Sequence, residues 1–129
     1  MVTRLMEVWI IDKSGLSLIH SRSPQIANKP TISPVLFSGF LTAVESLSAE
    51  AIDAIKMKDS KIMILPIQKP SKFFVVGRTK IKEKDNNMRK VLQKIAEEFI
   101  DEFGVLISSW NGDHQIFTFF QDNISKYLF

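Results

Sequence analysis

Two neighbouring stretches decide the fold: Lys61-Ile-Met-Ile-Leu-Pro-Ile-Gln68 and, after a turn at Lys69-Pro-Ser71, Phe73-Phe-Val-Val-Gly-Arg-Thr79. Their lengths and their β-branched and aromatic residues predict two strands. Neither Ile62–Leu65 nor Phe73–Val76 alternates with polar residues, so each strand is expected to be apolar on both sides. Strands of that kind are buried on both faces of a sheet. The sequence therefore predicts helices above and below this sheet.

Three more strands are expected around this pair. Arg4–Ile11 and Leu16–Ser21 are separated by Asp12-Lys-Ser-Gly15, which has the composition of a hairpin turn. Ala54–Lys58 fits a short edge strand before a turn at Lys58-Asp-Ser60. Between these strands, residues 23–33 lack periodicity and predict a loop.

The first helix is predicted from Ser33-Pro34, a serine cap followed by proline at the first helical position, to Ile52. Its apolar residues recur at helical spacing, at Leu36, Phe37, Phe40, Leu41, Val44, Leu47, Ala51 and Ile52. The opposite side of this helix carries small, mostly uncharged residues: Ser38, Gly39, Thr42, Ala43, Ser46 and Ala49.

Small residues let a second backbone approach closely, so we interpret this side of the helix as a partner-binding face. The alternative is that small residues are simply acceptable here, with part of the face against the 23–33 loop. The sheet edges, expected at the strands from Leu16 and from Ala54, offer a second route to a dimer. Lys56 and Lys58 would instead protect one of those edges against association.

The second long helix is expected from Asn86 to Phe103, with Gly104 as its stop. Its inward side has Met88, Val91, Leu92, Ile95, Phe99 and Phe103, and its outward side has Lys90, Gln93, Lys94, Glu97 and Asp101. Three shorter helical pieces are expected after it, at 105–110, 113–120 and 122–128. Their inward residues would be Ile116, Phe117, Phe120, Ile124, Tyr127 and Leu128.

Length and composition indicate one globular domain: 129 residues, 45% hydrophobic, 24% charged and no cysteine. The sequence has neither an apolar run long enough for a membrane span nor a signal peptide, which predicts a cytoplasmic protein. The net charge of +3 is small, and Lys80, Lys82 and Lys84 are interpreted as a solvated loop. No nucleic-acid partner is expected, since a dense basic stripe with exposed aromatics is missing.

No motif predicts catalysis, a cofactor or a metal site. His20 and His114 lack the spacing of metal ligands, and Asp113 beside His114 is expected to cap a helix. The five glycines are too dispersed for a phosphate-binding loop. Trp9 and Trp110 are expected in the core or at its rim. The acidic group Glu97, Glu98, Asp101 and Glu102 fits a solvated helix face better than a cation site.

The order strand-strand-helix-strand-strand-strand-helix resembles the longin and roadblock families. Glu7-Val-Trp-Ile-Ile-Asp-Lys-Ser-Gly15, Phe37-Ser-Gly-Phe-Leu41 and Trp110-Asn-Gly-Asp113 contribute to the likeness, which covers nearly the whole chain. It is most similar to the small prokaryotic, especially archaeal, longin-like proteins, because two long helices are expected and none precedes the first strand as one does in roadblock proteins.

The resemblance implies an α+β sandwich. Its five-stranded antiparallel sheet has the order 2-1-5-4-3, one helix on one face and the C-terminal helices on the other. It also implies dimers, and a role in vesicle trafficking or in regulating small GTPases. Many such domains hold partners with the first helix and its neighbouring strands, which correspond here to 34–52 and 54–58. Longin-bearing fusion proteins continue into a coil-forming segment, so a chain ending at Phe129 is not expected to be one.

The sequence thus favours a non-enzymatic interaction module that forms a homodimer, or a heterodimer with a related domain, and binds a small GTPase. Recruitment to a membrane surface would occur through partners. The main alternative is a sensor that holds a small ligand between sheet and helix. Large side chains in that space argue against a ligand cavity: Phe37, Phe40, Phe73 and Phe99. A third possibility is an enzyme with a site shared across an oligomer interface.

Overall fold

Five strands form one antiparallel sheet in the order β2-β1-β5-β4-β3, as the resemblance implied. In this computed structural model they are β1 (Glu7–Asp12), β2 (Ser17–Arg22), β3 (Ala54–Lys56), β4 (Ser60–Ile67) and β5 (Phe73–Lys80). The edge strands, β2 and β3, are the two that the sequence predicted. The structure describes residues 4–13, 17–24, 39, 54–69, 72–108, 117 and 120–128, with the backbone alone for 105–108.

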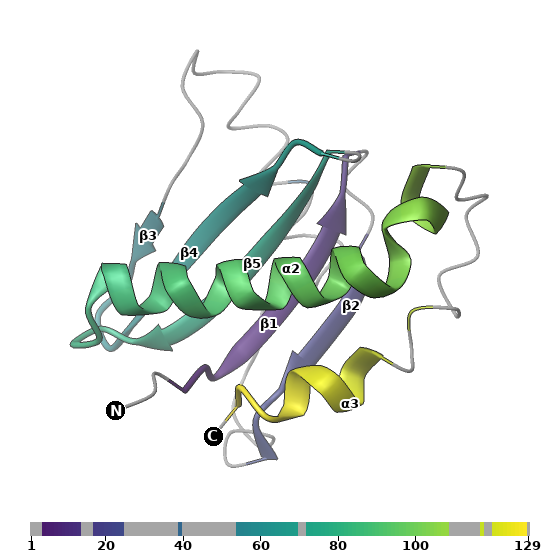
Figure 1. Ribbon diagram of the computed structural model, residues 1–129. Coiled ribbons are helices and arrows are strands. Elements are labelled where there is room, and N and C mark those ends of the chain that lie inside the picture. The colour runs from purple at the N-terminus through teal and green to yellow at the C-terminus, as the bar shows by residue number, and fades with distance from the viewer. Residues whose placement is uncertain are drawn as a thin grey trace.

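Two helices pack on one face of this sheet (Figure 1). The long helix α2 (Asp85–Ser108) crosses the strands, and the short helix α3 (Phe120–Ser125) lies beside β2. The inward residues predicted for α2, from Met88 to Phe103, are all buried, and the predicted outward residues are exposed. The periodicity of the sequence therefore predicted the correct orientation of this helix.

The predicted end of this helix at Gly104 is wrong, because α2 continues without a break to Ser108. Gly104 is buried inside the helix. A glycine in a helix interior costs only about 1 kcal/mol relative to alanine. Burial of the neighbouring Phe103, which is 6% exposed, offsets that cost and the helix goes on. The separate helical piece predicted at 105–110 therefore begins, at 105–108, as part of α2.

Both faces of the central strands are buried, as their unbroken apolar runs predicted. On the side of α2, Val8, Ile10, Met63 and Val75 join the residues of the helices in one hydrophobic cluster. On the other face a second cluster, at most 9% exposed, consists of Trp9, Ile11, Ile62, Ile64, Phe74 and Val76. The predicted core position of Trp9 is confirmed.

The end of the described chain packs beside its beginning rather than forming a helix to Leu128. Helix α3 ends at Ser125, and Leu128 forms a parallel bridge with Leu5. The Leu5 amide donates to the Tyr127 carbonyl at 2.8 Å, so pairing with a neighbouring backbone replaces the last helical turn. Phe117, Phe120, Ile124, Tyr127 and Leu128 are buried, as predicted.

Several predicted features lie outside the described residues: most of the 23–33 loop, the first helix apart from Gly39, and Trp110, Asp113, His114 and Ile116. Gly39 itself has helical backbone, in agreement with the prediction. Neither of the two described helices has the length and apolar character that a membrane crossing would need.

Candidate functional site

Of the six residues predicted to bind a partner, the structure describes Gly39. It is exposed, and a Cβ atom added to it would meet no atom of the described residues within 4 Å. Ser38, Thr42, Ala43, Ser46 and Ala49 lie outside the described residues, so their placement on a common face stays a prediction.

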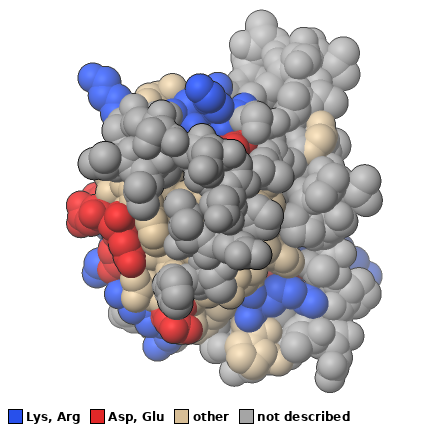
Figure 2. All heavy atoms as spheres, turned by 90° about the vertical axis from the view of Figure 1, so that its right-hand side faces the viewer, with Lys and Arg blue, Asp and Glu red and all other residues tan. Residues whose placement is uncertain are grey.

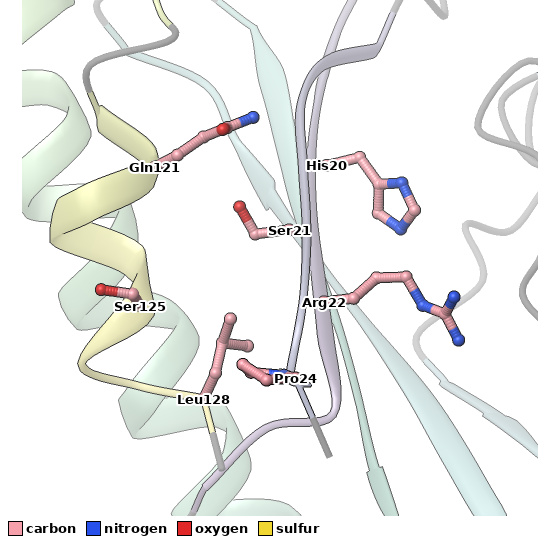
Figure 3. Close-up of a pocket in the computed structure, with 7 residues that line it drawn as sticks. All are labelled: His20, Ser21, Arg22, Pro24, Gln121, Ser125 and Leu128. Atoms are coloured by element: carbon pink, nitrogen blue, oxygen red, sulfur yellow. The ribbon is translucent and has the colours of Figure 1, made fainter. Parts of the chain in front are cut away.

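The edge strand β2 lies beside a pocket of about 410 Å³. Its lining residues are His20, Ser21, Arg22, Pro24, Gln121, Ser125 and Leu128. Ser21 and Gln121 extend into the space between β2 and α3, whereas His20 and Arg22 extend to the other side of the strand (Figure 3). The pocket therefore offers uncharged polar groups, and its α3 residues Gln121 and Ser125 are exposed to solvent.

On that other side of β2, His20 and Arg22 belong to a buried ionic cluster centred on Glu7. The Glu7 carboxylate is fully buried and lies 2.8 Å from His20 Nε2 and 3.6 Å from Arg22 Nε. Arg78 donates from Nη1 to Glu7 at 3.0 Å and from Nε to Ser60 at 3.1 Å. One carboxylate thus connects strands β1, β2 and β5 through two arginines and one histidine, each with a side chain 20% exposed.

The indole of Trp9 stacks on the imidazole of His20, with ring centroids 5.1 Å apart and planes 3° from parallel. Trp9 therefore fixes the ring plane in which His20 meets Glu7. Sequence reasoning missed this ionic cluster. The available signal was a glutamate inside an otherwise apolar strand, since buried carboxylates need partners. Its partners, 13 to 71 residues away, could be found only from the strand register.

A second buried charged residue, Lys61 of β4, forms hydrogen bonds at the start of α2. Its side chain is 5% exposed and donates to the Glu83 carbonyl and to the Asp85 carboxylate. The hydrogen bond from Lys61, followed by its positive charge, lowers the pKa of Asp85 below the ordinary value of 3.8. This pairing orients the connection between β5 and α2.

The pairing predicts a pH dependence of stability. Because the pKa of Asp85 is lower in the folded chain, the ion pair stabilises the fold above pH 3.8 and loses that effect as the pH falls through the folded value. Asp85→Asn should lower the Tm at neutral pH, and the difference from the unsubstituted chain should shrink in acid. Thermal melts from neutral to acidic pH measure this. Asp101→Asn, on the outer side of α2, is the control, and a difference that does not change with pH would contradict the prediction.

Two members of the acidic group of α2, Glu98 and Glu102, form hydrogen bonds with residues near the end of the chain. Glu98 accepts hydrogen bonds from Lys126 and from the Tyr127 hydroxyl, both at 2.9 Å, and Glu102 accepts one from Asn123 at 3.2 Å. Burial raises the pKa of Glu98, but these hydrogen bonds outweigh it and hold the pKa below 4.5. Burial, then Glu98, raises the pKa of Tyr127 to about 12. No group of three potential metal ligands occurs within the described part of the chain.

Solved structures share this architecture. Myxococcus xanthus MglB matches with a TM-score of 0.58 and 17% identity over 79% of each chain. The chain has a longin/roadblock-like fold. A second structure, of MglB with tetrameric arrangement, matches with a TM-score of 0.54 and 14% identity, over 80% of this chain and 79% of the other. No family model and no curated protein matches the sequence.

Proposed function

We propose that this longin/roadblock-like chain is a non-enzymatic interaction module that dimerises and regulates a small GTPase. The observation that carries the proposal is the match of the 2-1-5-4-3 sheet and its helices to MglB over about four fifths of both chains. Domains of the longin and roadblock families serve in complexes that regulate small GTPases. Because one fold can host many functions, the proposal is tested by a direct binding measurement.

Two features of the described residues support association with other chains. The sheet ends in the edge strands β2 and β3, whose outer backbone groups are suited to pairing with a further strand. Gly39 is exposed, and a Cβ atom added to it would meet no described atom within 4 Å. The tetrameric arrangement of MglB in the second matching structure supports oligomer formation in general. We assign the partner face to Ser38, Gly39, Thr42, Ala43, Ser46 and Ala49.

The test is light scattering on the purified chain, alone and mixed with small GTPases of the same genome in both nucleotide states. A dimer that gains mass with one nucleotide state is expected. A monomer that binds no GTPase in either state would refute the proposal and favour the ligand sensor.

Gly39 provides a matched pair of variants for this experiment. Gly39→Arg places a long charged side chain on the proposed partner face, at an exposed position where a Cβ atom meets no described atom within 4 Å. We expect the apparent affinity for the partner to fall at least about tenfold, or about 1.4 kcal/mol. Gly39→Ala should bind normally, and Ser46→Arg and Ala49→Arg should behave like Gly39→Arg. Retained binding in all three arginine variants would place the interface elsewhere.

The second candidate function is a small-ligand sensor, which the pocket between β2 and α3 favours. Binding sites usually bury most of the surface of a small ligand. This pocket has exposed residues on its α3 side, and the space between the sheet and α2 is filled by large side chains such as Phe73 and Phe99. If native mass spectrometry detected a ligand retained through purification, the small-ligand sensor would become the favoured function over regulation of a GTPase.

A further inference from the structure

Two turns at one end of the sheet form a surface that the proposed function does not use. The first joins β3 to β4, and the second joins β5 to α2 (Figure 1). The Met57 amide donates to the Ser60 carbonyl at 2.8 Å, and the Ile81 amide donates to the Asp59 carbonyl at 3.2 Å. The first hydrogen bond closes the β3–β4 turn, and the second joins this turn to the β5–α2 turn. We call residues 56–61 and 80–89 the basic tip.

The basic tip concentrates the positive charge of the molecule. It contains seven basic and three acidic side chains, a net charge of +4, whereas the whole chain has +3. Buried Lys61 is matched by Asp85. The remaining charge comes from five exposed lysines and Arg89, less Asp59 and Glu83, and the lysines are Lys56, Lys58, Lys80, Lys82 and Lys84. Figure 2 views the molecule from the side away from the tip, where acidic and basic side chains both lie on the surface.

Apolar side chains are exposed among these lysines. Met57 and Ile81 are each 37% exposed and are the two large apolar residues classed as exposed in the described part of the chain. Strand β4 separates them, so with neighbouring strands about 4.8 Å apart they lie on the order of 10 Å from each other. Each is flanked in sequence by two lysines, Met57 by Lys56 and Lys58 and Ile81 by Lys80 and Lys82.

We propose that the basic tip binds the surface of an anionic phospholipid membrane directly, without a recruiting partner. Lysines near such a surface are attracted by the lipid phosphates, and their aliphatic stems lie along the interface. Met57 and Ile81 would enter the boundary between head groups and acyl chains between those lysines. A single-stranded nucleic acid is less well matched, because stacking needs exposed aromatic rings and the basic tip contains none.

The probe is sedimentation of the full chain with vesicles of phosphatidylcholine, alone or mixed with phosphatidylglycerol. Binding is expected to the mixed vesicles and to weaken with added salt. Each lysine contributes a factor of roughly five near an anionic surface, so Lys58→Gln with Lys82→Gln should lower partitioning roughly 30-fold. The matched control is Lys69→Gln with Lys72→Gln, two exposed lysines from the turn between β4 and β5, which should reduce it much less.

The apolar residues are tested separately. Met57→Gln with Ile81→Gln leaves the charge unchanged and should lower partitioning by roughly fivefold, since only part of each side chain is free to enter the membrane. Circular dichroism confirms that each variant is folded. Three results would overturn the proposal: no binding to anionic vesicles, equal losses in the two lysine pairs, or tighter binding to RNA than to anionic vesicles at the same salt concentration. The test involves no GTPase, so its outcome is independent of the function proposed above.

Discussion

Glu7→Ala is expected to lower the free energy of unfolding by about 3–5 kcal/mol, because it removes one partner of a buried ionic cluster. The Glu7 side chain is fully buried and lies within 3.6 Å of side-chain nitrogens of His20, Arg22 and Arg78. Each of these three side chains is only 20% exposed, so water cannot fully replace the carboxylate. Urea unfolding followed by circular dichroism measures the change.

The control is Glu98→Ala, which breaks a partly exposed ion pair with Lys126 and a hydrogen bond from the Tyr127 hydroxyl. A surface pair contributes at most about 1 kcal/mol and a hydrogen bond about 1 kcal/mol, so this variant should lose less than Glu7→Ala. Glu7→Gln should fall between them, since the amide keeps hydrogen-bonding capacity but not the charge. Equal losses in the two alanine variants would mean that the Glu7 cluster contributes no more than a surface ion pair.

The Glu7 cluster also determines how firmly the edge strand is held. His20 and Arg22 belong to β2, Glu7 to β1 and Arg78 to β5, so one carboxylate joins three adjacent strands. If a partner pairs with the β2 edge, Glu7→Ala should weaken that association as well as the fold. Gly39→Arg should affect association alone, which separates the two effects.

The arrangement of elements was predictable because the core patterns are local. Ile62–Leu65 and Phe73–Val76 indicate strands buried on two sides, and the spacing from Met88 to Phe103 fixes the inward face of α2. The strand order came from the resemblance, not from periodicity, and the structure bears it out. Short-range patterns therefore predicted the elements, and the likeness to known domains predicted their assembly.

What could not be predicted depends on contacts between residues far apart in the sequence. Glu7 and Arg78 are 71 residues apart, and Lys61 and Asp85 are 24 apart, so neither pairing leaves a local pattern. Gly104 was misjudged because the same residue ends one helix and is tolerated inside another, depending on the packing around it. The partner face of the first helix stays a prediction, since Gly39 is its one described member.

Phe99→Ala is expected to cost about 3–5 kcal/mol, the range for truncating a buried aromatic residue. Phe99 is fully buried, and its ring lies 5.2 to 5.5 Å, centre to centre, from four other phenylalanine rings. Those rings belong to Phe73 of β5, Phe103 of α2, Phe120 of α3, and Phe117, which precedes α3. Truncation would leave a cavity where these elements meet. Phe99→Leu, which keeps most of the volume, should cost less than about 1.5 kcal/mol.

In Phe99→Ala, the loss of structure should appear first in α3. This helix has six residues, too few to be stable alone, and depends on Phe120, Ile124 and the contacts of Tyr127 and Lys126 with Glu98. Hydrogen exchange in Phe99→Ala should therefore lose protection at α3 before β4 and β5. The pocket beside β2, with Gln121 and Ser125 in its lining, would be lost in the same step. If α3 kept its protection while the central strands lost theirs, Phe99 would not be the residue that anchors it.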